Sequence, residues 1–249
     1  MRLYKIMTWI KRNRITEEEL FSYIKCPINY ETTYIRKFTP KETVSMNVLL
    51  NKVFKVFCTH LMNGKIMSTN DLKIKWDRIC ESYPEYINPQ RSLDGLGLLM
   101  KMWNWAAEVE LQIIDMGLPY TIGSKFQDKV IELDGCIGII AKDLMQNFYL
   151  LDMDFGNKYT EQAFLDMKLK YTIDCYAFKE LYNKDLHVKI HNVKNNKDFF
   201  TDRHEDDFKR MKATIANVGG SVLNKMFYPR ETSFCKSCNL LNFCKMWKC

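Results

Sequence analysis

Four cysteines near the end of the sequence constrain this chain more than any other feature. They are Cys235, Cys238, Cys244 and Cys249, with the spacing C-x2-C-x5-C-x4-C. Thiolates packed this densely usually hold a metal ion or an iron–sulfur centre. The first three can reach one centre from a single irregular loop, so the source of the fourth ligand determines which kind of centre forms.

The composition indicates a folded protein in a reducing compartment. Apolar residues make up 47% of the 249 positions and charged residues 27%, which is typical of a chain that buries a core. The net charge of +7 favours a nucleic-acid partner only mildly. No apolar run approaches the ~18 to 20 residues of a membrane span, and Met1–Arg14 does not resemble a secretory signal. We therefore expect a cytoplasmic protein without membrane contact, whose cysteines hold a centre rather than form disulfides.

The first half of the chain predicts helices. Thr16 and Glu19 have the spacing of a capping box, so we expect a helix to begin there. That helix runs into Cys26-Pro27, where the proline disfavours helical dihedrals at Cys26. Cys26 is therefore either a buried core cysteine or a ligand beside a bend. Apolar spacing predicts further helices over Val44–Met62, Asn70–Cys80 and Leu93–Met116, so that everything up to about Gly117 is expected to be helical.

The second half changes its hydrophobic period and predicts strands. Val130–Ile140 and Asn147–Met153 are apolar, β-rich runs around the turn Ala141–Gln146, which indicates a hairpin. Gly219-Gly220 is expected to interrupt the charged helix that begins at Arg203. The other elements expected here are a strand over Tyr120–Phe126, a helix over Tyr159–Tyr182, a strand pair over His187–Val193 and Asp198–Thr201, and a charged helix over Arg203–Ala216. Four cysteines in apolar contexts read as small core residues, namely Cys58, Cys80, Cys136 and Cys175.

Two acidic residues interrupt the apolar runs of the predicted hairpin. Asp134 precedes Gly135, and Asp152 closes the run Phe148–Leu151. A carboxylate in a buried strand is costly unless it is paired or binds a cation. If the two strands are neighbours, both carboxylates can face one point, where hard oxygen ligands suit Mg²⁺ or Mn²⁺. Asp154 faces the same side as Asp152 if the strand persists. The competing interpretation is that these acids lie at turns and strand ends and face solvent.

A helical front, a hairpin with two acids, a long helix and a terminal C-x2-C-x5-C together resemble the RecB-like branch of the PD-(D/E)XK nucleases. The resemblance runs from about Thr16 to Trp247. Within that branch, the chain is most similar to the iron–sulfur members, namely the CRISPR-associated exonucleases and the AddB-type nuclease domain. In those members an early cysteine, usually followed by proline, joins three C-terminal cysteines around one 4Fe–4S cluster. The resemblance therefore implies a cluster held by Cys26, Cys235, Cys238 and Cys244.

The resemblance also implies a catalytic metal site on the strand acids. It assigns Mg²⁺ or Mn²⁺ to Asp134 and Asp152, with Asp154 as a candidate third carboxylate. The family's D-x-K string carries its lysine where this chain has Asp154. We expect Lys168 to supply the missing charge from the next helix, with Lys158 as a weaker candidate, because a helical lysine can occupy the same volume above the metal. The competing interpretation makes Lys168 a solvated helix residue.

Other positions of the family pattern are matched unevenly. Tyr176 matches the tyrosine of the helix after the hairpin and is assigned a place in the catalytic site. Thr172 stands where that helix usually has glutamine. Phe54 falls near the place of the family's upstream histidine, for which His60 is a substitute candidate. Two metal acids are thus kept, whereas the lysine and the glutamine are replaced.

These inferences predict an α/β fold with a PD-(D/E)XK restriction-endonuclease-like core, in which helices flank a central mixed sheet. We expect one integrated domain, with a helical region over 1–117, the core over 118–230 and a cysteine clasp over 231–249. The predicted function is metal-dependent cleavage of DNA, either single-stranded or end-containing double-stranded. One alternative is an inactive pseudo-nuclease that binds DNA or a protein partner in recombination or defence. The other is a zinc-stabilised binding module held by Cys235, Cys238, Cys244 and Cys249.

Overall fold

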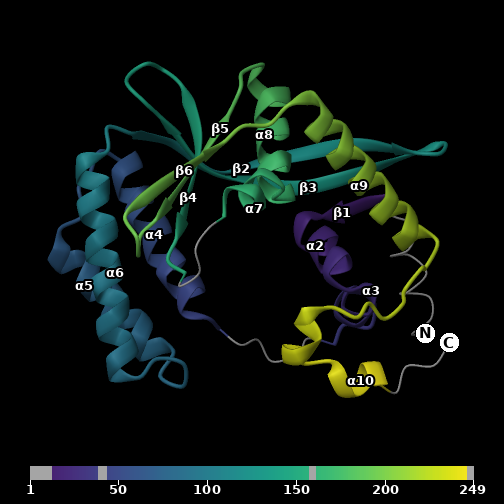
Figure 1. Ribbon diagram of the computed structural model, residues 1–249, viewed down its shortest axis with the longest axis horizontal. Helices are drawn as coiled ribbons and strands as arrows, with labels where there is room; N and C mark the ends of the chain where they lie inside the picture. Colours follow the sequence, from purple (N-terminus) through teal and green to yellow (C-terminus); the bar gives the residue numbers. More distant parts are fainter. Residues whose placement is uncertain (1–12, 39–43, 157–160, 246–249) are drawn as a thin grey trace. The chain divides into compact units, whose positions relative to one another are not determined.

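The computed structural model describes residues 13–38, 44–156 and 161–245 (Figure 1). Its contacts divide the chain into two compact units whose segments alternate along the sequence. The first unit contains Met1–Glu42, Pro119–Gly135 and Asp206–Cys249, and the second contains Thr43–Leu118 and Cys136–Glu205. The division into 1–117, 118–230 and 231–249 that the sequence suggested stays a prediction.

The first unit begins with a short strand that leads into a capped helix. The Thr16 hydroxyl accepts from the Glu19 backbone, and the Glu19 carboxylate accepts from the Thr16 backbone, so the predicted capping box is confirmed. Cys26 has extended dihedrals between two helices, as expected before Pro27. The elements are β1 (Arg14–Thr16), α2 (Glu17–Lys25), α3 (Pro27–Tyr30), the π-helical turn η1 (Glu31–Ile35), η2 (Ser233–Ser237) and α10 (Leu241–Lys245).

The long helix α9 (Glu205–Leu223) corrects the prediction of a break at Gly219-Gly220. It is one continuous helix through both glycines (Figure 1). A Cβ on Gly219 would collide with Ile131, and a Cβ on Gly220 would collide with Phe126. The glycines therefore permit close packing of the helix against these side chains, and that packing outweighs their poor helix propensity.

The second unit contains a mixed sheet, as the sequence predicted. Its strands are hydrogen-bonded in the order β3-β4-β5-β6, with antiparallel, parallel and antiparallel pairs in turn. The predicted hairpin is confirmed, because Ile139 pairs with Leu151 across β3 and β4. The strands are β2 (Gln112–Phe126), which pairs with β3, β3 (Lys129–Lys142), β4 (Phe148–Asp154), β5 (His187–Asn192) and β6 (Lys197–Thr201), and β2 and β3 contribute residues to both units.

Helices cover both faces of β4 within the second unit. The even positions face α8 (Leu169–Tyr182), because Phe148 lies 5.3 Å from Phe178 between ring centroids. The odd positions Leu151 and Met153 belong to the apolar core formed with the other helices. This alternation follows from the two-residue period of a strand. The opposite layer consists of α4 (Met46–Met62), α5 (Thr69–Ser82) and α6 (Pro89–Glu108).

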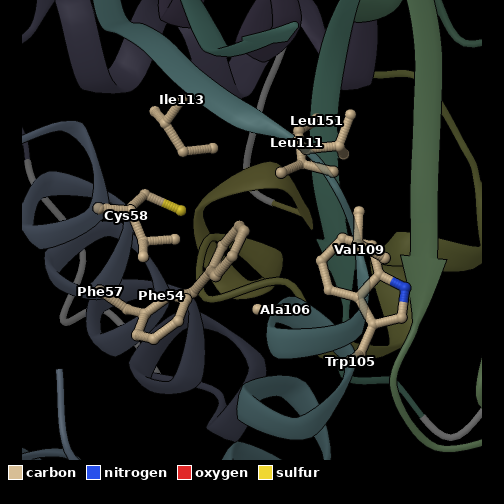
Figure 2. Close-up of a pocket in the computed structure, with 10 residues that line it drawn as sticks. Phe54, Phe57, Cys58, Trp105, Ala106, Val109, Leu111, Ile113 and Leu151 are labelled. Atoms are coloured by element: carbon tan, nitrogen blue, oxygen red, sulfur yellow. The ribbon is translucent and has the colours of Figure 1, made fainter. Parts of the chain in front are cut away.

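The helix predicted over Leu93–Met116 is shifted toward the N-terminus. α6 begins at Pro89, whose missing N–H is tolerated at the first helical position, and Asn88 caps it. It ends at Glu108, and Gln112 already belongs to β2, so the region before Gly117 is not entirely helical. The inner face of this layer forms an apolar pocket around Trp105 (Figure 2), lined by Phe54, Phe57, Cys58, Leu61, Trp105, Ala106, Val109, Leu111, Ile113 and Leu151.

The helix predicted over Tyr159–Tyr182 is two helices with a bend. α7 (Gln162–Asp166) ends before Met167, and Lys168 caps α8 with extended dihedrals. Of the cysteines expected in the core, Cys58 and Cys175 are buried, whereas Cys136 is exposed. No helix in residues 13–38, 44–156 and 161–245 is long and apolar enough to cross a lipid bilayer.

Candidate functional site

The second unit brings a carboxylate, a phenol and an ammonium together where β4 meets the start of α8. The Tyr171 hydroxyl donates to Asp152 Oδ2 at 2.5 Å. The Lys168 ammonium donates to the Tyr171 oxygen at 2.7 Å and lies 3.6 Å from the same Asp152 oxygen. The expectation that Lys168 comes close to the strand acid therefore agrees with the geometry of this unit.

The bend between α7 and α8 explains why Lys168 reaches Asp152. Lys168 precedes the first turn of α8, and its backbone N–H donates to the Leu165 carbonyl at 3.1 Å. The sequence instead suggested a position inside one continuous helix over Tyr159–Tyr182. Tyr171 then lies at the start of α8, three residues after Lys168, so both side chains point to the same end of the strand.

Tyr171 was missed by the sequence analysis. Its side chain is buried, and burial raises its pKa, with the nearby Asp152, Asp154 and Asp174 adding to the shift. The phenol is therefore a neutral hydrogen-bond donor at ordinary pH. Only its position near the N-terminus of α8 could have indicated it, since the family pattern directed attention to Tyr176, which lies on the same helix.

Asp154 is held by a separate set of hydrogen bonds. Its Oδ2 accepts from Asn192 Nδ2 at 2.9 Å, and its Oδ1 accepts from the Gly156 backbone at 2.7 Å. Asn192 is placed for this contact because it pairs with Asp154 across β4 and β5. Asp152 and Asp154 occupy alternate positions of one strand, and both carboxylates are fixed. Their oxygens are hard donors of the kind that Mg²⁺ and Mn²⁺ prefer.

The argument that these acids are buried was wrong. The Asp152 side chain is 41% exposed and the Asp134 side chain is 31% exposed. The buried acid of this region is Asp174, whose side chain is 2% exposed and pairs with Lys170 at 2.5 Å. Lys170 also donates to the Cys136 carbonyl at 3.0 Å. The lysine and aspartate four residues apart on α8 could have suggested this pair.

Asp134, the first predicted metal acid, lies in the first unit and has an arginine partner. The Arg14 guanidinium contacts both oxygens of Asp134, with Nη2 at 2.7 Å from Oδ1, and Thr121 donates to Oδ1 at 2.7 Å. Hydrogen bonding to Arg14 lowers the pKa of this carboxyl. Asp134 and Asp152 belong to different units, so their meeting at one metal ion stays a prediction.

The remaining candidate positions differ in their surroundings. Thr172 accepts a hydrogen bond from the buried Arg203, at 2.9 Å from its Nε. Phe54 is buried in the apolar core and lines the pocket of Figure 2, so it offers no ligand atom. His60 lies on α4, and its substitute role stays a prediction. Lys158 lies outside the described residues.

The segment before the cysteine tail packs on the helices that carry Cys26. Phe227 stacks on Tyr30 with ring centroids 5.9 Å apart. Arg230 donates to the Ile24 carbonyl at 2.7 Å, two residues before Cys26. The tail therefore approaches Cys26 within the first unit, although almost the whole chain separates them in sequence.

Three of the predicted cluster cysteines influence the fourth, Cys244. Burial raises the pKa of Cys244, and the charges of Cys26, Cys235 and Cys238 raise it further. A thiolate set from two converging segments fits an iron–sulfur centre in its donor chemistry. Among the residues that the structure describes, however, no three His, Cys, Asp or Glu side chains are gathered at metal-binding spacing. Cys249 and Trp247 lie outside the described range.

Comparison with known proteins shows a likeness in fold. A crystal structure of a "Putative exonuclease" from Eubacterium rectale superposes with a TM-score of 0.53 over 99% of this chain and 91% of that one, at 8% identity. A crystal structure of the protein SSO0001 gives a TM-score of only 0.37 at 13% identity, over 79% of this chain and 93% of that one. No family model and no curated protein matches the sequence. The first comparison therefore shows that this chain shares the α/β fold of that protein.

Proposed function

We propose that this protein is a metal-dependent nuclease that hydrolyses phosphodiester bonds in DNA at the Asp152 site of the second unit. The observation that carries the proposal is the 3.6 Å approach of the Lys168 ammonium to Asp152. This cation restores the charge that the D-x-K string lacks at Asp154. The fold likeness to a protein described as an exonuclease agrees with the proposal but does not carry it.

In this proposal, Asp152 and Asp154 hold Mg²⁺ or Mn²⁺, with Asp134 as a further candidate ligand. The bound ion supplies a Lewis acid for the scissile phosphate and for the attacking water. Lys168 balances negative charge as it develops on the phosphate oxygens, because it lies beside the acid yet remains partly exposed. Tyr171 orients Asp152 through its hydrogen bond and keeps its own proton.

The test is cleavage of end-labelled single- and double-stranded DNA with Mn²⁺ by the wild-type protein and by Asp152→Ala. We expect cleavage by the wild type and loss of at least about a hundredfold in the variant, since the variant removes a proposed metal ligand. The half-exposed position of Asp152 predicts little change in stability, to be checked by thermal unfolding. Equal cleavage by both proteins would contradict the proposal.

A pseudo-nuclease is the second candidate, and the Arg14–Asp134 pair favours it. A guanidinium on both oxygens of Asp134 competes with any cation for that carboxylate. Such a protein would bind DNA, or a protein partner in recombination or defence, without cleaving DNA. DNA binding by the wild type and by Asp152→Ala, with no cleavage by either, is the result that supports this candidate.

We also propose that Cys26, Cys235, Cys238 and Cys244 bind a structural 4Fe–4S cluster. The support is their occurrence in one unit and the packing of the tail on the Cys26 helices. When bound, the cluster supplies a cross-link between the two ends of the chain, so binding would be coupled to folding. A zinc site that uses Cys249 instead of Cys26 is the alternative.

A further inference from the structure

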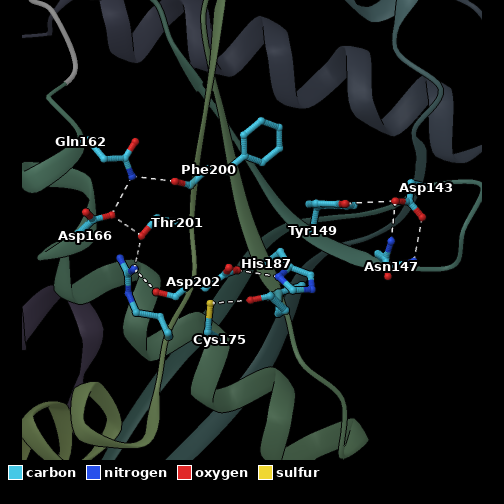
Figure 3. A network of polar contacts seen from close by, with 12 residues as sticks. Asp143, Asn147, Tyr149, Gln162, Asp166, Cys175, His187, Phe200, Thr201 and Asp202 are labelled. Atoms are coloured by element: carbon cyan, nitrogen blue, oxygen red, sulfur yellow. Dashed lines mark hydrogen bonds and ion pairs between the residues drawn. The ribbon is translucent and has the colours of Figure 1, made fainter.

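The turn between β3 and β4 presents apolar side chains to solvent on a rigid frame. Leu144 is 72% exposed and Met145 is 83% exposed. Asp143 fixes the turn, because its carboxylate accepts from the backbone and the side chain of Asn147, each at 2.9 Å, and from the Tyr149 hydroxyl at 3.1 Å (Figure 3). Two exposed apolar residues on an ordered turn indicate a contact surface rather than a loosely packed loop.

An aromatic and basic surface adjoins this turn. Phe148 contacts Phe178 at 5.3 Å, and Phe178 contacts the exposed Tyr182 at 4.9 Å, so the three rings form a row. Lys142 and Lys184 lie at 5.5 and 5.0 Å from the centroid of the same Phe148 ring. We call Lys142, Leu144, Met145, Phe148, Tyr182 and Lys184 the stacking surface.

The stacking surface and Asp152 lie at opposite ends of the part of β4 that α8 covers. Phe148 and Asp152 lie on the same side of β4, four residues or about 13 Å apart. α8 runs beside them, with Tyr171 on Asp152 and Phe178 on Phe148. Leu150, the even position between them, is 2% exposed, so the stacking surface is separate from the proposed catalytic acid.

We propose that the stacking surface binds single-stranded nucleic acid. Tyr182 and Phe148 offer ring faces to unpaired bases, which a duplex keeps stacked, and Lys142 and Lys184 offer cations to the phosphates. Two lysines against one ring disfavour a second copy of this chain as the occupant, because a symmetric contact brings like charges together. This binding does not depend on the proposed function.

The test measures binding in EDTA, where cleavage does not interfere, by fluorescence anisotropy of a labelled single-stranded oligonucleotide. We expect Tyr182→Ala to weaken binding about tenfold. Lys142→Gln with Lys184→Gln should weaken binding and lower the slope of log K against log salt by about 0.7 for each lost phosphate contact. The matched control is Phe200→Ala, because Phe200 is also exposed and has Lys189 5.4 Å from its ring; its binding should stay unchanged.

Three outcomes overturn the inference. The first is that Tyr182→Ala and the lysine variant bind the oligonucleotide as tightly as the wild type. The second is that the wild type binds a duplex of the same length with equal affinity. The third is that the protein self-associates in sedimentation and that Leu144→Ser with Met145→Ser abolishes this association. Thermal unfolding of each variant ensures that lost binding is not lost folding. Binding in EDTA without cleavage in Mn²⁺ would reject the proposed function alone. Cleavage in Mn²⁺ by the wild type, together with unchanged binding by the stacking-surface variants in EDTA, would reject this inference alone.

Discussion

Replacing the buried Arg203 by methionine should destabilise the second unit strongly. The guanidinium donates four hydrogen bonds: to Thr172 Oγ1 at 2.9 Å, Thr201 Oγ1 at 2.6 Å, the Asp202 carbonyl at 2.8 Å and the Leu165 carbonyl at 2.7 Å. These acceptors come from α8, from the end of β6 and from α7, so one side chain holds three segments together. Methionine fills a similar volume but donates none of these bonds.

The magnitude follows from the number and burial of the lost bonds. A hydrogen bond from a charged donor stabilises by about 1.5–3 kcal/mol, and four independent bonds would give roughly 6–12 kcal/mol. The four bonds share one guanidinium, and some of their acceptors can rehydrate, so the sum is an upper limit. Each neutral acceptor that stays buried without a donor costs about 1–3 kcal/mol, and those that rehydrate cost less. We therefore expect a loss of about 4 kcal/mol, or on the order of 10 °C in Tm.

Urea unfolding followed by circular dichroism measures this loss. The control is Arg210→Met on α9, whose exposed side chain makes one ion pair with Asp207 at 2.8 Å and should contribute less than about 1 kcal/mol. Arg203→Lys should recover only part of the stability, because an ammonium cannot reproduce the geometry of the guanidinium. A change below about 1 kcal/mol for Arg203→Met would show that the four bonds do not hold the three segments together.

Three further predictions concern the cysteines. Iodoacetamide at pH 8 should modify the exposed Cys136 in the native protein but not Cys58, because burial raises the Cys58 pKa to about 12; peptide mass spectrometry that finds equal labelling would contradict this. The raised pKa of Cys58 also makes the free energy of unfolding fall as pH rises from about 9 toward 12, because the thiol ionises first in the unfolded chain. A free energy of unfolding that stays constant across this range in urea titrations would contradict this prediction. Cys26→Ser should abolish absorption near ~400 nm in anaerobically purified protein while Cys249→Ser retains it, whereas colourless protein with stoichiometric zinc would reject the cluster.

Local signals in the sequence were sufficient for much of the fold. The capping box at Thr16, the extended Cys26 before Pro27 and the hairpin of β3 and β4 each depend on neighbouring residues, and each is confirmed. The continuous α9 was missed because Gly219 and Gly220 make contacts with residues far away in sequence. Helix propensity is a weak term that tertiary packing overrides, and a single sequence does not reveal that packing.

The candidate site was predictable in its members but not in its geometry. Lys168 was expected inside one continuous helix over Tyr159–Tyr182, yet it reaches Asp152 because a bend after α7 places it at the N-cap position of α8. Tyr171 and the buried Asp174 lie on α8, so the pattern of acids in the strands did not indicate them. The cost of burial suggested a role for Asp152, but its carboxylate is half-exposed, so the contact with Lys168 now carries the argument instead.

The most direct test of the account compares Mn²⁺-dependent DNA cleavage by the wild type, Lys168→Met and Lys179→Met. Lys179 lies on the same helix and pairs with Glu205 at 3.2 Å, so its variant is matched in charge and in change of side chain. We predict that Lys168→Met lowers the rate of DNA cleavage by about 10²–10³-fold with Tm unchanged. Lys179→Met should cleave DNA like the wild type. Full activity in Lys168→Met would contradict the assignment of this lysine to the catalytic site.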